Sequence, residues 1–347
     1  MKKEELTALL CEPQAWMERD GPGGDLAIST RIRFARNLKG YRFPSAASPE
    51  ELHVVRESIR TTAAHVTPSL RVVDLEDVTP RARHILVEKF LISPQMAAGG
   101  TGSLLLFDED VSAMVNEEDH LRLQCIVAGL DLQTAYARLD ALDDALEERL
   151  DFAFSERWGY LTACPSNVGT GLRASVMLHL PALAISGALT AVFEGLKGLG
   201  VTARGIYGEG TDAAGAIFQI SNQVTLGVGE RDLLAKVEGV ARTLSERERS
   251  AREHLLRTAH DAVVDRIWRA FGTLKTARSI SYGEAAELLS LVRWGSRERI
   301  LPEIARPTLN GLLSRIGAAG LGRPGDDASA NRLRATLLRE TFARYPC

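Results

Sequence analysis

Five short stretches of the chain gather arginines, glycines and carboxylates, the residue types that handle phosphate groups and cations. They are STRIRFAR (29–36), NEEDHLR (116–122), CPSNVGTGLRAS (164–175), RGIYGEG (204–210) and FQISNQ (218–223). Taken singly, each also fits a simpler structure, such as an amphipathic strand, a helix N-terminus that favours acids, or a glycine turn. A P-loop is excluded at 164–175, because Gly171 is followed by Leu172 and Arg173 where that motif needs lysine and a hydroxyl residue.

Taken together, the five stretches predict a site for phosphoryl transfer. Five guanidinium groups, which exceed what surface ion pairs require, suit a triphosphate because arginine forks bind phosphate oxygens in pairs and stabilise transition-state charge. Two carboxylates, Glu118 and Glu209, do not help to hold phosphate, so we expect them to hold a cationic group. The five arginines are Arg31, Arg33, Arg122, Arg173 and Arg204.

These motifs, in this order over roughly residues 25–255, resemble the catalytic domain of the phosphagen kinases, the family of arginine and creatine kinases. The resemblance is closer to the bacterial protein arginine kinase branch (McsB type). It rests on STRIRFARNLKGYRFP, LVEKFLISP, NEEDHLRLQC, GYLTACPSNVGTGLRASVMLHLPAL, RGIYGEGTDAAGAIFQISNQVTLG and ERSARE. It implies an antiparallel sheet flanked by helices, with ATP lying across the sheet and Mg²⁺ held mainly by the phosphates.

The resemblance also implies residue roles. Glu118 and Glu209 grip the substrate guanidinium, with Glu118 as the base, and Cys164 lies beside the same group as a thiolate; a structural buried thiol is the alternative for Cys164. A base is needed because a guanidinium has a pKa above about 12 and is no nucleophile while protonated. The implied ATP-binding residues are Ser29, Thr30, Arg31, Ile32, Arg33, Arg122, Arg173, Ala174, Ser175, Val176, Met177, Arg204, Gly205, Ile206, Tyr207, Gly208 and Glu209.

The patterns around the motifs predict an α+β fold: a phosphagen-kinase-like catalytic domain (25–255) after an N-terminal segment (1–24), followed by an all-helical dimerisation and regulatory domain (256–347). We expect a helix over 50–66, helices through 117–150, and one long helix over 245–274. SYGE (281–284) fits a capping box that opens a further helix, and two more are expected near 306–313 and 329–344. Strands are expected at 71–77, 103–110, 111–116, 160–164, 201–208 and 216–227, the second and third forming a hairpin.

The substrate follows from what precedes the first motif. The first motif begins at Ser29, and the 28 residues before it are too few for the helical lid domain that closes over small guanidino substrates in the family. We therefore expect an open site that accepts arginine side chains of proteins. The family further implies a homodimer, and as partners a zinc-binding activator protein, a heat-shock repressor and the Clp protease machinery. A kinase for a small guanidino metabolite and a non-catalytic phosphoarginine adaptor are the alternatives; intact Glu118, Glu209 and Cys164 disfavour the adaptor.

Two positions depart from the family pattern. Phe90 stands where the family has a histidine that approaches the nucleotide, and phenylalanine cannot donate to phosphate. In the tail, the family's phosphoarginine motif R-D-x-x-R-A aligns with ANRLRA (330–335), so Ala330 and Asn331 replace the leading Arg-Asp pair. We therefore expect the allosteric pocket of the tail to be lost.

Composition sets the surroundings. The chain has 347 residues, 45% of them hydrophobic and 25% charged, with no membrane-length apolar run and no signal peptide, so a cytoplasmic protein without membrane or direct nucleic-acid contacts is expected. Four scattered cysteines without a C-x-x-C pair indicate reduced thiols and no metal site. Residues 251–347 carry a net positive charge, which fits either binding to an acidic or phosphorylated partner or a solvated helical surface.

Overall fold

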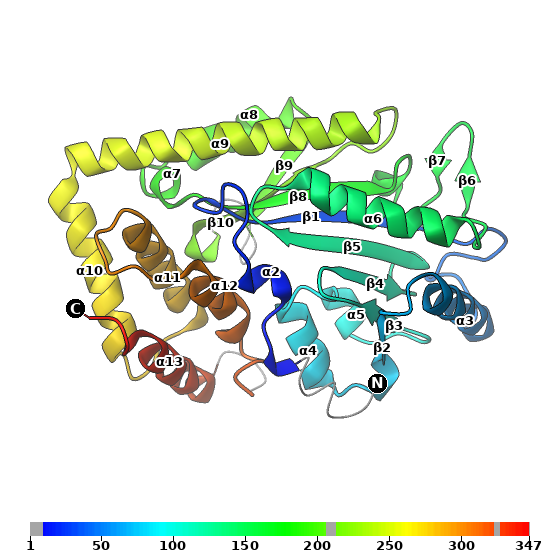
Figure 1. Ribbon diagram of the computed structural model, residues 1–347, viewed down its shortest axis with the longest axis horizontal. Coiled ribbons are helices and arrows are strands. Elements are labelled where there is room, and N and C mark those ends of the chain that lie inside the picture. The colour runs from blue at the N-terminus through cyan, green and yellow to red at the C-terminus, as the bar shows by residue number, and fades with distance from the viewer. Residues whose placement is uncertain (1–9, 206–212, 323–326, 347) are drawn as a thin grey trace.

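The structure is a computed structural model that describes residues 10–205, 213–322 and 327–346. Its centre is an eight-stranded sheet in the order β2-β3-β4-β5-β1-β8-β10-β9, in which every neighbouring pair is antiparallel (Figure 1). A short hairpin, β6 with β7, stands beside it. The strands are β1 (Ala27–Arg36), β2 (Arg71–Asp74), β3 (Leu104–Phe107), β4 (Val111–Val115), β5 (Leu121–Ala128), β6 (Phe154–Ser155), β7 (Gly159–Tyr160), β8 (Leu172–His179), β9 (Val201–Gly205) and β10 (Ile217–Asn222).

The two faces of the central strands differ because side chains alternate along a strand. On β1, Ile32 and Phe34 are wholly buried in the main core, whereas Arg31 and Arg33, which alternate with them, point to the other face. The core side is covered by helices α3, α6, α8 and α9 (Figure 1). The helices of this part are α2 (Ala15–Glu18), α3 (Pro49–Val66), α4 (Pro80–Glu88), α5 (Pro94–Ala97), α6 (Leu132–Glu147), α7 (Pro181–Ile185), α8 (Leu189–Lys197) and α9 (Glu230–Thr258).

A second core lies among the C-terminal helices α10 (His260–Thr276), α11 (Tyr282–Arg297), α12 (Arg306–Arg315) and α13 (Ala328–Phe342). We call β1 to α9 the sheet unit and α10 to α13 the helical unit. The long helix expected over 245–274 is two helices, because Ala259 leaves helical geometry (φ −140°, ψ 36°) and the chain turns there (Figure 1). The turn lets α9 pack on the sheet while α10 packs into the second core.

Two other expectations were wrong in detail. The segment 121–128, expected as helix, is strand β5, because Leu121, Leu123 and Cys125 alternate into the core while Arg122 and Gln124 face away. The helix begins at Leu132, after Gly129 with a φ of +72°. The strand expected at 160–164 is reduced to β7, which ends at Tyr160.

Several local predictions were confirmed. The helix expected over 50–66 is α3, which begins at a capping box formed by Ser48 and Glu51, and β3 and β4 form the expected hairpin. Helix α11 begins after SYGE as expected; Ser281 accepts a hydrogen bond from the Glu284 N–H, which is one half of the predicted capping box. Within the described residues, no helix has both the length and the apolar character that crossing a membrane requires.

The sheet unit and the helical unit are joined by polar contacts, one of which is buried. His179, the last residue of β8, forms a hydrogen bond with Ser290 of α11 (Nε2 to Oγ, 2.7 Å). The Glu88 carboxylate at the end of α4 accepts hydrogen bonds from the N–H groups of Ala319 and Gly320. The end of a central strand is therefore tied directly to the helical unit.

Candidate active site

The polar face of the central sheet collects the arginines of four strands. Arg33 of β1 lies directly opposite Arg173 of β8, and Arg31 lies opposite Ser175. The next strand outward, β10, places Gln219 opposite Arg204 of β9. On the other side, β5 contributes Arg122. Cross-strand neighbours lie about 4.5–5.5 Å apart at Cβ, so the register builds one continuous cationic surface.

The arginines perturb one another. Burial first, and then the positive charges of Arg122 and Arg173, lower the pKa of Arg31 to about 10. The pKa of Arg33 is also lowered, by burial and then by Arg31, Arg122 and Arg173, and that of Arg173 by burial and then by Arg204 and Arg122. The Nε of Arg33 is buried and has no hydrogen-bond partner among the described residues. Partly buried like charges with unused donors form a site that fits a polyanion such as a triphosphate.

Two adjacent carboxylates hold Arg122 from the turn between β4 and β5. Glu117 Oε2 lies 2.6 Å from Arg122 Nη1, and Glu118 Oε2 lies 3.0 Å from Nη2. The Glu117 side chain is 1% exposed and also accepts a hydrogen bond from Ser93, whereas the Glu118 side chain is 32% exposed. Glu117 therefore fixes the arginine, whereas Glu118 is partly exposed and pairs with Arg122 through Oε2.

Cys164 lies beside this turn in the segment that leads into β8. Its sulfur is 3.0 Å from Ser166 Oγ, and its carbonyl accepts a hydrogen bond from Thr162. Asp119 anchors the segment, since one oxygen accepts hydrogen bonds from both the Ala163 N–H and the Asn37 side chain. Cys164 is half-buried, whereas Cys125 is wholly buried with its pKa raised to about 12 by burial. Cys164 and Glu118 both lie within electrostatic range of Arg173.

A buried ion pair supports the same segment from below. Arg36, at the end of β1, pairs with Asp143 of α6 at 2.5 Å and donates to the Thr170 carbonyl. Its guanidinium lies 3.5 Å from the ring centroid of Tyr160. Gly171 has a φ of +64°, and a Cβ there would lie 2.6 Å from both the Ala35 carbonyl and Arg36. Gly171 therefore allows close packing of this segment on Arg36.

At the other end of the polar face, apolar side chains lie among the polar ones. A narrow pocket there is lined by Trp16, Ser29, Arg31, Phe90, Ile126, Ser175, Met177 and Gln219. The rings of Phe90 and Trp16 meet edge to face with centroids 5.9 Å apart. Phe90, which replaces the family's histidine, therefore packs against a tryptophan, and its carbonyl accepts a hydrogen bond from Gln124.

The structure brings together some of the residues predicted for the site and separates others. The five arginines, Glu118, Cys164, Ser29, Ser175 and Met177 line the polar face or the segments around it. Four predicted side chains point to the opposite, core face, so just their backbone borders the site: Thr30, Ile32, Ala174 and Val176. Gly205 ends β9, and Ile206, Tyr207, Gly208 and Glu209 lie outside the described residues.

Sequence reasoning missed several residues that position the site. Glu117 was visible within NEEDHLR but was not assigned, and Gln219, which accepts a hydrogen bond from Arg31, lay within FQISNQ. Asp119 belonged to the same acidic stretch. Asp143 carried no local signal, because its partner Arg36 is 107 residues away.

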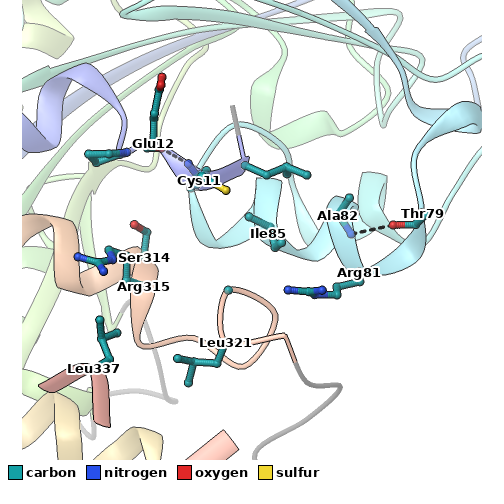
Figure 2. Close-up of a pocket in the computed structure, with 14 residues that line it drawn as sticks. Cys11, Glu12, Thr79, Arg81, Ala82, Ile85, Ser314, Arg315, Leu321 and Leu337 are labelled. Carbon is teal, nitrogen blue, oxygen red and sulfur yellow. Dashed lines mark hydrogen bonds between the residues drawn. The ribbon is translucent and has the colours of Figure 1, made fainter. Parts of the chain in front are cut away.

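A larger cavity lies elsewhere, between the N-terminal segment, α4 and the α12–α13 connection (Figure 2). It measures about 490 Å³ and shares no described lining residue with the arginine face. Nearby, Arg334 of the altered tail motif is wholly buried. Its guanidinium donates to the carbonyls of Ile316 and Ile280 and to Asn331 Oδ1. These bonds commit Arg334 and Asn331 to holding the helices of the helical unit together.

Comparison with known proteins agrees with this geometry. The family model of the ATP:guanido phosphotransferase C-terminal catalytic domain matches residues 53–251, and the model of the protein-arginine kinase McsB C-terminal domain matches residues 260–346. The chain is 46% identical to the protein-arginine kinase of Moorella thermoacetica over 94% of this chain and 97% of that one. It is also 46% identical to that of Symbiobacterium thermophilum, over 93% and 95% of the two chains.

Solved structures are similar as well. A lombricine kinase superposes with a TM-score of 0.59 at 24% identity, covering 70% of this chain and 72% of that one. The duplicated taurocyamine kinase of Schistosoma mansoni, with bound transition-state analogue components, gives 0.61 at 26% identity, covering 74% and 39%. With an arginine-lined antiparallel sheet and near full-length relatives of 43–46% identity, this chain belongs to the ATP:guanido phosphotransferase family.

Proposed function

We propose that the protein transfers the γ-phosphoryl group of ATP to arginine side chains of other proteins. The observation that carries the proposal is the juxtaposition of five arginines on one sheet face with Glu118 and Cys164 at its border. The arginines bind and neutralise phosphate, while the partly exposed carboxylate of Glu118 receives a guanidinium. Relatives named protein-arginine kinase, which match along nearly the whole chain, support the choice of acceptor.

In this mechanism the chain positions two reactants and moves one proton. Arg31, Arg33 and Arg173 hold the phosphates across the strands, and Arg122 is aimed by Glu117. Glu118 orients the incoming guanidinium and accepts its proton as a nitrogen attacks the γ-phosphorus, and Cys164 lies against the same group. We assign Glu209 as the second carboxylate of the grip. Positioning for in-line attack supplies on the order of 7–11 kcal/mol, and a general base adds roughly 10²–10⁴-fold.

Magnesium enters this proposal with the nucleotide. Mg²⁺ keeps several waters and is commonly held by substrate phosphates with one or two carboxylates, so we expect its ligands to be mainly phosphate oxygens. When bound, the ion would neutralise part of the charge on the phosphates. The five arginines do the same from the protein side.

The wider setting follows from the same assignment. We propose a cytoplasmic homodimer in which residues 25–255 catalyse transfer and residues 256–347 serve dimerisation and regulation. A cytoplasmic location supplies ATP and keeps Cys164 a free thiol. Marking proteins for Clp-type degradation in a stress response, with a zinc-binding activator and a heat-shock repressor as partners, would be the corresponding physiological role.

The test is a product assay. The protein is incubated with Mg·ATP and, in parallel, with an unfolded protein or with free arginine, lombricine or taurocyamine, and products are analysed by mass spectrometry without acid, which would cleave the P–N bond. Phosphoarginine in the protein, with little product from the small guanidino compounds, is the expected result. Efficient transfer to a small compound alone would instead make the protein a metabolite kinase.

A further inference from the structure

A second group of arginines surrounds a cavity of about 540 Å³ away from the catalytic sheet. The cavity lies between the turn before β1, which carries Asp20, Gly24 and Asp25, and the corner where α11 meets α12. Four of its lining residues are arginines: Arg293, Arg297, Arg299 and Arg306. The volume is within the roughly 300–1,000 Å³ range of small-molecule sites.

Three of these four arginines form no ion pair with an acidic residue among the described residues. Asp20 pairs with Arg306 at 2.9 Å, and Asp25 pairs with Arg249 at 3.0 Å. Among the described residues, no carboxylate lies within ion-pair distance of Arg293, Arg297 or Arg299. Glu303 is exposed at the rim and leaves the cavity with a surplus of arginine.

Arg293 is the most informative member. The residue is 92% buried, with 8% of its surface exposed, and the hydrogen bond that it makes within the described structure runs from Nη2 to Asn310 Oδ1 at 2.8 Å. A guanidinium has five N–H donors, so most of those of Arg293 are left for a ligand in the cavity. Burial first, and then Arg306 and Arg252, lower its pKa to about 10. A buried, unpaired cation lowers the stability of the fold, and an anion bound beside it would offset that loss.

The corner itself is suited to an anion. Helix α12 begins at Arg306, and its first residues, Arg306 and Pro307, line the cavity, so the positive N-terminal end of the helix borders it. Ser296 Oγ accepts a hydrogen bond from the Ile304 N–H at 2.8 Å and fixes the connection between the two helices. The backbone that carries the exposed Arg297 and Arg299 is therefore fixed on both sides of the corner.

We propose that this cavity binds an oxyanion of the phosphate class, held by Arg293, Arg297 and Arg299 at the junction of the two units. The ligand is either inorganic phosphate or a phosphate monoester, since both present the oxygens that arginine forks bind. The site is separate from the catalytic arginines and needs neither ATP nor an arginine substrate. On this proposal, part of the net positive charge of residues 251–347 serves to bind an anion.

Occupation of the cavity has a route to the catalytic sheet. Arg293 lies one helical turn from Ser290, which is bonded to His179 at the end of β8, the strand that carries Arg173. Arg252 approaches His179 Nδ1 at 3.5 Å from α9. An anion at Arg293 reduces the positive electrostatic field at His179, whose pKa is lowered in part by Arg293 and Arg252. Binding should therefore stabilise the junction of the two units.

The experiment titrates sodium phosphate, and separately phosphoserine, into the full-length protein by calorimetry. The test variant is Arg297→Gln with Arg299→Gln, two exposed positions outside the catalytic machinery. Arg269→Gln, an exposed arginine of α10 paired with Asp265, is the matched control. Phosphate that binds the arginine sheet contributes equally to all three proteins, so their difference reports the cavity. Arg293→Gln, checked for folding by circular dichroism, is a third variant.

We expect one or both probes to bind at least about tenfold more weakly to the double variant than to wild type and the control, because charge-assisted contacts are lost. Loss for inorganic phosphate assigns the free anion, and loss for phosphoserine alone assigns a monoester. Identical binding in all three proteins, no binding of either probe, or an equal thermal stabilisation by sodium chloride at matched ionic strength overturns the proposal. None of these readouts depends on phosphoryl transfer, so the result stands apart from the proposed function.

Discussion

Glu118→Gln is the sharpest perturbation of the catalytic assignment. The substitution removes the base but retains a side chain of the same size. We expect turnover to fall by 10²–10⁴-fold, which corresponds to about 2.7–5.4 kcal/mol on the barrier. The fold should hardly change, since the Glu118 side chain is 32% exposed and such ion pairs contribute about 0–1 kcal/mol to stability.

The neighbouring carboxylate supplies the matched control. Glu117 is buried and holds Arg122 at 2.6 Å, so Glu118→Gln leaves that arginine in place and ADP binding near the wild-type value. Glu117→Gln should instead free Arg122 and weaken nucleotide binding as well as turnover. Transfer to an unfolded protein is followed by ADP release under non-acidic work-up, and nucleotide affinity by calorimetry. Turnover of Glu118→Gln within a few-fold of wild type, or the same pattern in both variants, would refute the division of roles.

Three further outcomes are expected. Arg173→Ala and Arg204→Ala should each lower kcat by about 10²-fold or more, since each removes a donor to transition-state charge; unchanged kcat in steady-state assays would make them surface residues. His179 is buried with its pKa held well below normal, by burial and then by Arg252 and Arg293, so the unfolded chain binds the extra proton below pH 6.5. Wild type should therefore lose about 1 kcal/mol of unfolding free energy relative to His179→Gln between pH 6.5 and 5.5, and parallel urea curves would contradict this. Phosphoarginine should not bind tightly at the N-terminal turn of α13; micromolar binding by calorimetry that Asn331→Ala abolishes would show otherwise.

How far the sequence predicts this fold depends on where the information lies. Arg31 and Arg33 alternate with Ile32 and Phe34, so a strand with one charged and one apolar face could be expected from neighbouring residues alone. The segment 121–128 was wrongly expected to be helical, because over so few residues its apolar positions fit the helical period and the strand period equally well. The break at Ala259 had no glycine or proline to announce it; it follows from the need to fill two separate cores.

The site shows the same limit. The arginines and Glu118 belong to compact motifs, and their chemistry could be inferred before any coordinates. Glu117 and Glu118 are indistinguishable in the sequence, and burial separates their roles. Arg36 with Asp143 and Arg293 with its cavity join segments far apart along the chain, so their pairing depends on tertiary packing that no local pattern encodes.

The register of the cationic strands has a mechanical consequence. A sheet resists shear through bonds between adjacent strands alone, and β9, which carries Arg204, is an edge strand that reaches the others through β10. A triphosphate bound by Arg204, Arg173 and Arg33 would connect β9 directly to β8 and β1, which β9 does not touch, and would offset the repulsion among these arginines. Amide hydrogen exchange in β9 should therefore slow on nucleotide binding far more than exchange in β2, the strand at the opposite edge. The bound substrate would thus stabilise the sheet of the enzyme that consumes it.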